Sequence, residues 1–142
     1  MSAAALEVFV DTSAWLALAN KSDRLHVPAV ELNRNLLAQG AHYLTTDAVL
    51  AEVANSLARP PLRHAVIRFL DAIFSSRRVT ILHGDPDRLA RGWQLYKDRP
   101  DQDWGLTDCI SFVVMTEAGI QEAFACDRHF QQAGYTCLLE LP

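Results

Sequence analysis

Cysteine, lysine and long apolar runs are all scarce in this chain of 142 residues. No uninterrupted apolar stretch reaches the 18 or so residues that a transmembrane helix needs, so we expect no membrane partner. Residues 1–7 lack the basic start and the apolar centre of a secretory signal peptide. These absences argue against the membrane and secreted classes and favour a cytoplasmic protein.

The three cysteines are Cys109, Cys126 and Cys137, and no two of them have the Cys-x-x-Cys spacing of a zinc or redox site. Each lies in an apolar run, where a reduced cysteine packs as a small hydrophobic side chain. We therefore expect buried free thiols, as in a reducing cytoplasm. The five histidines are scattered without a His-x-x-x-His pair, so they give little support to histidine-based chemistry.

The charge balance is acidic, with a formal net charge of −4 at pH 7. This argues mildly against a broad nucleic-acid-binding surface, which normally carries net positive charge. Five arginines nevertheless lie within one short stretch: Arg59, Arg63, Arg68, Arg77 and Arg78. A solvated helix face with salt bridges is the favoured interpretation of this stretch, and phosphate binding is the alternative.

The length suits one compact domain, in which strand-like and helix-like patterns alternate. Short β-rich runs are predicted at residues 7–10, 42–46, 79–82, 123–126 and 136–141, with helical patterns between them. One of these helices is predicted to carry an apolar side made of Val66, Ile67, Leu70, Ile73 and Phe74. The alternation predicts an α/β fold with a mainly parallel sheet, in which ligands bind beyond the carboxyl ends of the strands.

Four acidic residues stand where such a sheet would bring them together. Asp11 directly follows the first predicted strand and Asp127 the fourth, so both should emerge at the same edge. Asp108 is predicted in the first turn of a helix, where the helix dipole favours negative charge. Glu52 lies within an otherwise apolar helix, and we expect it to border the buried face.

Each acid also has a purely structural interpretation, as a helix cap, a turn residue or a solvated side chain. The combination is what indicates a site. Two unit charges about 4 Å apart repel by roughly 4 kcal/mol at an effective dielectric of 20. Four carboxylates in one pocket therefore need protons or a cation, and Mg²⁺ or Mn²⁺ suits oxygen ligands. Such a metal can assist hydrolysis of a phosphodiester bond.

Several polar residues accompany the acids and are accessory candidates: Thr12, Ser13, Asn55, Thr107 and Ser111, with Asp103 as a possible fifth carboxylate. Helix capping explains them at least as well, and Thr107 in particular is predicted as an N-cap. For substrate contacts, the candidates are Arg59, Arg63 and Trp104. The tryptophans Trp15, Trp93 and Trp104 are otherwise expected as core or interface anchors.

Four segments resemble, in order, the PIN domain family, and within it the VapC-like toxins of bacterial toxin–antitoxin pairs. They are residues 9–15 (Phe-Val-Asp-Thr-Ser-Ala-Trp), 50–55 (Leu-Ala-Glu-Val-Ala-Asn), 103–111 (Asp-Trp-Gly-Leu-Thr-Asp-Cys-Ile-Ser) and 125–130 (Ala-Cys-Asp-Arg-His-Phe). Any one segment is weak evidence, whereas the ordered set is specific. Gly105 departs from the pattern, since many relatives carry a small polar residue there.

The resemblance implies a single PIN-like domain over residues 1–142, built as a three-layer α/β/α sandwich with a parallel sheet. It implies an endoribonuclease that depends on Mg²⁺ or Mn²⁺, a frequent homodimer, and inhibition by a cognate antitoxin segment in the active-site groove. Asp11, Glu52 and Asp108 would be the core acids. Asp127 would be the fourth and would share the metal with Asp11 and Asp108, while Asp103 would be accessory.

Three other interpretations remain open. The chain can be a housekeeping RNA-processing nuclease, or a non-catalytic PIN-like scaffold that binds RNA or protein. It can also be a phosphatase or phosphotransferase with Asp11 as nucleophile, as in haloacid-dehalogenase-like enzymes. That chemistry typically uses a second aspartate two residues on, where Ser13 stands here.

Overall fold

The structure, a computed structural model, describes residues 6–140, and within them five strands form one parallel sheet. The strands are β1 (Glu7–Val10), β2 (His42–Thr46), β3 (Val79–Leu82), β4 (Glu122–Phe124) and β5 (Thr136–Cys137). They lie in the order β3-β2-β1-β4-β5, and every neighbouring pair is parallel. The predicted α/β class with a parallel sheet is thereby confirmed.

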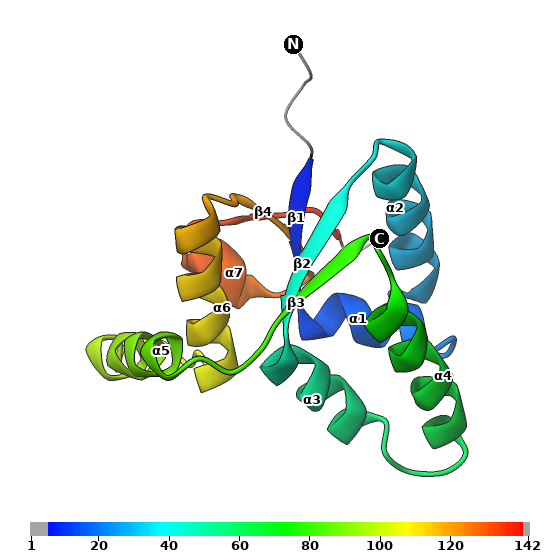
Figure 1. The fold of residues 1–142 in the computed structure, drawn as a ribbon, viewed down its shortest axis with the longest axis horizontal. Coiled ribbons are helices and arrows are strands. Elements are labelled where there is room, and N and C mark those ends of the chain that lie inside the picture. Colours follow the sequence, from blue (N-terminus) through cyan, green and yellow to red (C-terminus); the bar gives the residue numbers. More distant parts are fainter. Residues whose placement is uncertain (1–5, 141–142) are drawn as a thin grey trace.

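Seven helices connect the strands in the described part of the chain. They are α1 (Thr12–Ala19), α2 (His26–Ala38), α3 (Asp47–Ser56), α4 (Leu62–Ser75), α5 (Pro86–Asp98), α6 (Leu106–Ala118) and α7 (Arg128–Gln132). Helix α1 contacts α2, α3 and α4, whereas α6 contacts α5 and α7. Figure 1 shows α2 and α4 on one side of the sheet and α5, α6 and α7 on the other. This gives the predicted three-layer sandwich.

The central strand β1 is an apolar run because helices cover the sheet on both faces. Val8, Phe9 and Val10 are completely buried. Beside them, the indole N–H of Trp15 donates to the hydroxyl of Thr45 at 3.2 Å, and that hydroxyl donates to the carbonyl of Val10 at 2.9 Å. The polar atoms in this part of the core are therefore satisfied, and α1 is tied to β1 and β2.

Some predicted details of the fold are wrong. Strand β4 ends at Phe124, so Ala125 and Cys126 separate it from Asp127. Strand β5 is only two residues long; of the predicted run 136–141, residue 141 lies outside the described residues. The predicted apolar side of α4 is only partly buried. Ile67 and Phe74 are exposed, although α4 contacts α1, α3 and β3.

All three cysteines are free thiols. Cys109 is buried as expected, whereas Cys126 and Cys137 are only partly buried. Within residues 6–140, no helix combines the length and apolarity needed to cross a membrane.

The strand order places a topological switch point between β1 and β4. From β1 the chain proceeds outward to β2 and β3, and it then returns to the other side of β1 for β4 and β5. At such a point the connections leave the sheet in opposite directions and open a crevice beyond the strand ends. The backbone N–H of Asp11 donates to the carbonyl of Phe124 at 3.1 Å, so β1 and β4 end side by side there.

Candidate active site at the switch point

Asp11 lies directly after β1, beside the end of β4, and caps α1. Its Oδ2 accepts hydrogen bonds from the hydroxyl of Ser13 at 3.2 Å and, at 3.5 Å, from the backbone N–H of Ser13. The Ser13 hydroxyl in turn accepts from the N–H of Cys126 at 3.2 Å, which connects the start of α1 to the segment after β4. Asp11 is only 3% exposed. Burial, reinforced by the charges of Asp108 and Asp127, raises its pKa to about 7.

Asp108 reaches the same crevice from the first turn of α6, as predicted. Its Oδ2 accepts from the backbone N–H of Gly105 at 3.1 Å, so the side chain caps the helix that carries it. Burial raises the pKa of Asp108, and the nearby charges of Asp127 and Glu52 act in the same direction. Gly105 takes the N-cap position, so the prediction that Thr107 is the N-cap is wrong.

Asp127 caps α7, and its carboxylate accepts from the backbone N–H of His129 at 2.9 Å. Its charge acts on both Asp11 and Asp108. The structural and functional interpretations of these acids are thus compatible, because Asp11 and Asp127 cap helices whose first turns border the crevice.

Glu52 faces the crevice from α3 and is held by Thr12, whose hydroxyl donates to its Oε2 at 2.7 Å. The expectation that Glu52 borders the buried face is wrong, since the residue is exposed. Its charge nevertheless acts on Asp108. The structure therefore brings all four predicted acids to one place.

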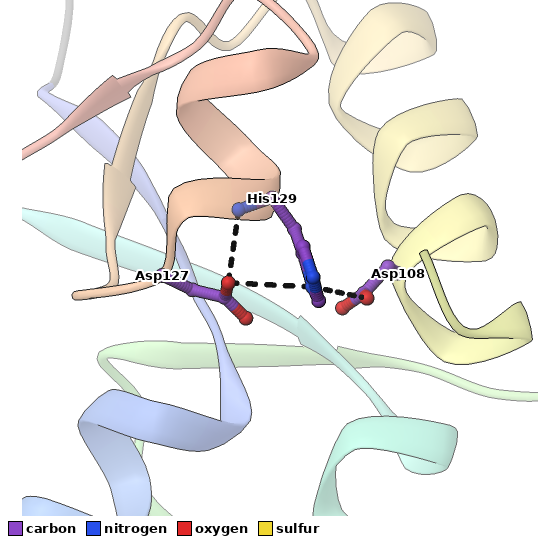
Figure 2. A group of neighbouring side chains, drawn as sticks. All are labelled: Asp108, Asp127 and His129. Carbon is purple, nitrogen blue, oxygen red and sulfur yellow. Dashed lines mark hydrogen bonds and ion pairs between the residues drawn. The ribbon is translucent and has the colours of Figure 1, made fainter. Parts of the chain in front are cut away.

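His129 is the site residue that the sequence analysis missed. Its Nδ1 lies 3.1 Å from Oδ2 of Asp108 and 3.3 Å from Oδ1 of Asp127. Figure 2 shows the imidazole between these two carboxylates. The one signal in the sequence was its position two residues after Asp127, in the first turn of a short helix.

Asp103 lies at the outer edge of the site in the loop before α6. Its Oδ1 is 3.1 Å from Nε2 of His129, and its Oδ2 accepts from the guanidinium of Arg128 at 2.6 Å. The Arg128 guanidinium holds the pKa of Asp103 below its usual range. Asp103 is therefore connected to the other acids through its contact with His129.

The other accessory candidates divide into two groups. Thr12 and Ser13 contact acids of the site directly. Ser111 instead donates its hydroxyl to the carbonyl of Thr107 within α6, at 2.9 Å, which uses its one donor inside the helix. Asn55 is exposed one turn beyond Glu52 on α3.

The substrate-binding candidates differ in exposure, since the two arginines are exposed and the tryptophan is buried. Arg59 and Arg63 are exposed around the connection between α3 and α4, where the Arg63 guanidinium donates to the carbonyl of Ala58 at 3.1 Å. Trp104 is 5% exposed and packs edge-on against Phe112. A base needs an open ring face to stack on, so the structure contradicts a stacking role for Trp104 and supports its alternative role as a core anchor.

The donor set fits a divalent cation. One ligand atom each from Asp108, Asp127 and His129 lies within 4.8 Å of the others, and the buried Asp11 carboxylate faces the same cluster. Grouped carboxylates are unfavourable unless a proton or a cation compensates their charge. Oxygen donors in such a group suit Mg²⁺ and Mn²⁺.

Comparison with known proteins agrees with this geometry. The PIN domain model matches residues 8–134. The 23S rRNA-specific endonuclease VapC20 of Mycobacterium tuberculosis is 32% identical over 128 residues, which cover 90% of this chain and 95% of the relative. The crystal structure of VapC20, described as a sarcin-ricin loop cleaving toxin, superposes with a TM-score of 0.80 and covers 91% of this chain and 96% of its own.

A more distant structure is VapBC2 from Rickettsia felis, bound to a DNA fragment from its promoter. It is 15% identical, with a TM-score of 0.68 over 93% of this chain and 96% of that one, and this likeness concerns the fold alone. The residues matched by the family model include all four acids and the strands β2, β3 and β4. The chain therefore belongs to the PIN domain family.

Proposed function

We propose that this protein is an endoribonuclease that hydrolyses RNA phosphodiester bonds with Mg²⁺ or Mn²⁺. The observation that carries the proposal is the convergence of Asp11, Glu52, Asp108 and Asp127 at the switch point of the sheet. The endonuclease activity of a relative that covers 90% of the chain supports the same chemistry.

In this proposal the side chains have distinct tasks. Asp11, Asp108 and Asp127 hold the cation, which when bound neutralises a phosphate oxygen and makes a water molecule more acidic. Glu52 positions the attacking water and accepts its proton, because it is the exposed acid of the four and its carboxylate is fixed by Thr12. Ser13 keeps Asp11 oriented towards the pocket.

RNA would approach the acid cluster from the side on which Glu52 is exposed. Arg128 is exposed beside the acids, and Arg59 and Arg63 are exposed near the end of α3. Guanidinium groups suit phosphate contacts because they donate two parallel hydrogen bonds. A few local arginines can thus bind RNA on a chain with net negative charge.

The cleavage assay uses RNA that contains the sarcin-ricin loop of 23S rRNA, the target in the relative's name, together with unrelated RNA. Asp11→Asn and Asp108→Asn should each lower the cleavage rate by about 100-fold or more, the scale of losing one charged contact to the transition state. EDTA should abolish cleavage by the wild type. Asp71→Asn, in an exposed position on α4, is the matched control and should cleave normally. Undiminished cleavage by both site variants would contradict the proposal.

We further propose that the enzyme acts in the cytoplasm as the toxin of a toxin–antitoxin pair. The relative whose structure is 32% identical is described as a toxin. Expression should arrest growth, Asp11→Asn should not, and co-expression of a small neighbouring open reading frame should relieve the arrest. Normal growth with the active enzyme would instead favour a housekeeping RNA-processing nuclease.

A homodimer is part of the same proposal. Helix α5 exposes Leu89, Trp93 and Tyr96, which recur at helical spacing and so share one face. The Trp93 and Tyr96 rings stack with centroids 5.2 Å apart, which makes a rigid aromatic surface of the kind found in interfaces. Sedimentation should show a dimer for the wild type and a monomer for Trp93→Glu. A wild-type monomer would remove this part of the proposal.

A further inference from the structure

His129 lies among carboxylates on both of its ring nitrogens. Nδ1 faces Asp108 and Asp127 at 3.1 and 3.3 Å, and Nε2 faces Asp103 at 3.1 Å. A neutral imidazole has one N–H and one lone pair. If the N–H is on Nε2 and donates to Asp103, the lone pair of Nδ1 points at two carboxylate oxygens. The lone pair and the two negatively charged carboxylates repel one another, and a cation between them would turn this repulsion into attraction.

The spacing suits a shared cation. Ligands bound about 2.1 Å from an octahedral metal and adjacent to one another are about 3 Å apart. The separations between Nδ1 and the two carboxylate oxygens are close to that value. His129 is also well shielded, since 19% of its side chain is exposed against 60% for Asp103.

We propose that Nδ1 of His129 is a ligand of the same cation as Asp108 and Asp127. The inference rests on the proposed function and adds a nitrogen donor to its all-carboxylate site. Asp103 is then a positioning residue: it accepts from Nε2–H, fixes the tautomer and turns Nδ1 towards the metal, as carboxylates commonly do for metal-bound histidines. Arg128 holds Asp103 in place at 2.6 Å.

A nitrogen donor changes which metal the site takes. Oxygen-only sites suit Mg²⁺, whereas imidazole ligands favour first-row transition ions. The cluster should therefore bind Mn²⁺ more tightly than Mg²⁺, and removing the imidazole should reduce the difference between the two affinities.

The experiment is pulsed EPR of Mn²⁺ bound to the full-length protein, without RNA. The electron spin echo of Mn²⁺ in the wild type should be modulated by a directly bound ¹⁴N nucleus. Labelling histidine with ¹⁵N should shift this modulation to the ¹⁵N frequency. His129→Asn should lose the modulation, whereas His64→Asn, an exposed control on α4, should keep it. Asp103→Asn should keep the modulation but bind Mn²⁺ about tenfold or more weakly.

The outcomes separate the inference from the proposed function. If the wild type binds Mn²⁺ and Asp11→Asn weakens that binding, but no histidine modulation appears, the metal site stands and the role of His129 is overturned. Modulation that persists in His129→Asn overturns it as well. If the wild type binds no Mn²⁺ at a specific site, the inference and the proposed function fail together.

Discussion

Asp11 combines two roles that usually belong to separate residues. It caps α1, which stabilises the fold, and it presents a buried carboxylate to two other acids. The hydrogen bonds from Ser13 and the backbone of α1 favour the ionised form, yet burial outweighs them and the pKa rises to about 7. Without a cation, the folded protein therefore holds a proton at Asp11 more tightly than the unfolded chain does.

This predicts a pH-dependent instability of the metal-free protein. A raised pKa in the folded state stabilises the fold below the unfolded pKa of Asp11, and the contribution is lost as the pH rises through about 7. Asp11→Asn keeps a capping side chain and removes the titration. Between about pH 5 and about pH 8, the wild type should therefore lose about 2–3 kcal/mol of unfolding free energy relative to Asp11→Asn.

Urea unfolding in EDTA measures this difference. Comparing the two proteins cancels the titration of most other groups, which they share. An equal free-energy difference at both pH values would mean that the Asp11 carboxylate is not held among other acids in the metal-free fold.

At the residue scale, the sequence could predict which acids matter but not all of their partners. Asp11 and Asp127 were predicted from their positions after apolar runs, and Asp108 from the start of a helix. His129 was not predicted, because a lone histidine carries no periodic signal and its importance comes from how α7 is placed. For Trp104 the sequence left two roles open, RNA stacking and core packing, and only its contact with Phe112 from a different element decides for the core.

Among the helices within residues 6–140, α5 and α6 make the most extensive contact, and Gly92 allows their close approach. An ideal Cβ added at Gly92 would lie 2.7 Å from Cγ1 and 3.3 Å from Cα of Ile110. Ile110 is two residues after Asp108 on α6, so this contact also helps to set where the metal-site acid stands.

Gly92→Ala should therefore destabilise the protein. Alanine gains roughly 1 kcal/mol over glycine within a helix, but overpacking of a close contact costs about 1–3 kcal/mol. We expect a net loss of up to about 2 kcal/mol, measured as unfolding free energy in urea. Gln94→Ala, on the exposed side of the same helix, should change stability little. A stabilised Gly92→Ala protein would show that α5 and α6 pack less closely than described.

The bounds of an element were predicted well where one sequence pattern dominates. They were predicted poorly where tertiary contacts decide at which residue the element begins or ends. The apolar run of β1 and the strands β2 and β3 match their predicted residues. Strand β4 stops before Cys126, whose N–H donates to the Ser13 hydroxyl. The start of α6 was misjudged because the cap comes from Asp108 reaching back to Gly105, while Thr107 lies within the helix.

On the scale of the whole molecule, strand order turns weak sequence signals into one site. Asp11 and Asp127 are 116 positions apart in the chain, and only a sheet with β1 beside β4 brings their elements together. Alternating patterns predicted a parallel sheet, but they did not give the order of its strands. Only the strand order of the structure shows that the acids converge. The proposal of a metal-dependent nuclease depends on this convergence.

The most direct measurement of that central claim is a calorimetric titration of Mn²⁺ into the wild type, Asp11→Asn and the exposed control Asp71→Asn. If the acids share one cation, the wild type and the control should bind Mn²⁺ saturably with equal affinity, and Asp11→Asn should bind at least about tenfold more weakly. Equal affinity in all three proteins, or no saturable binding in the wild type, would contradict the account.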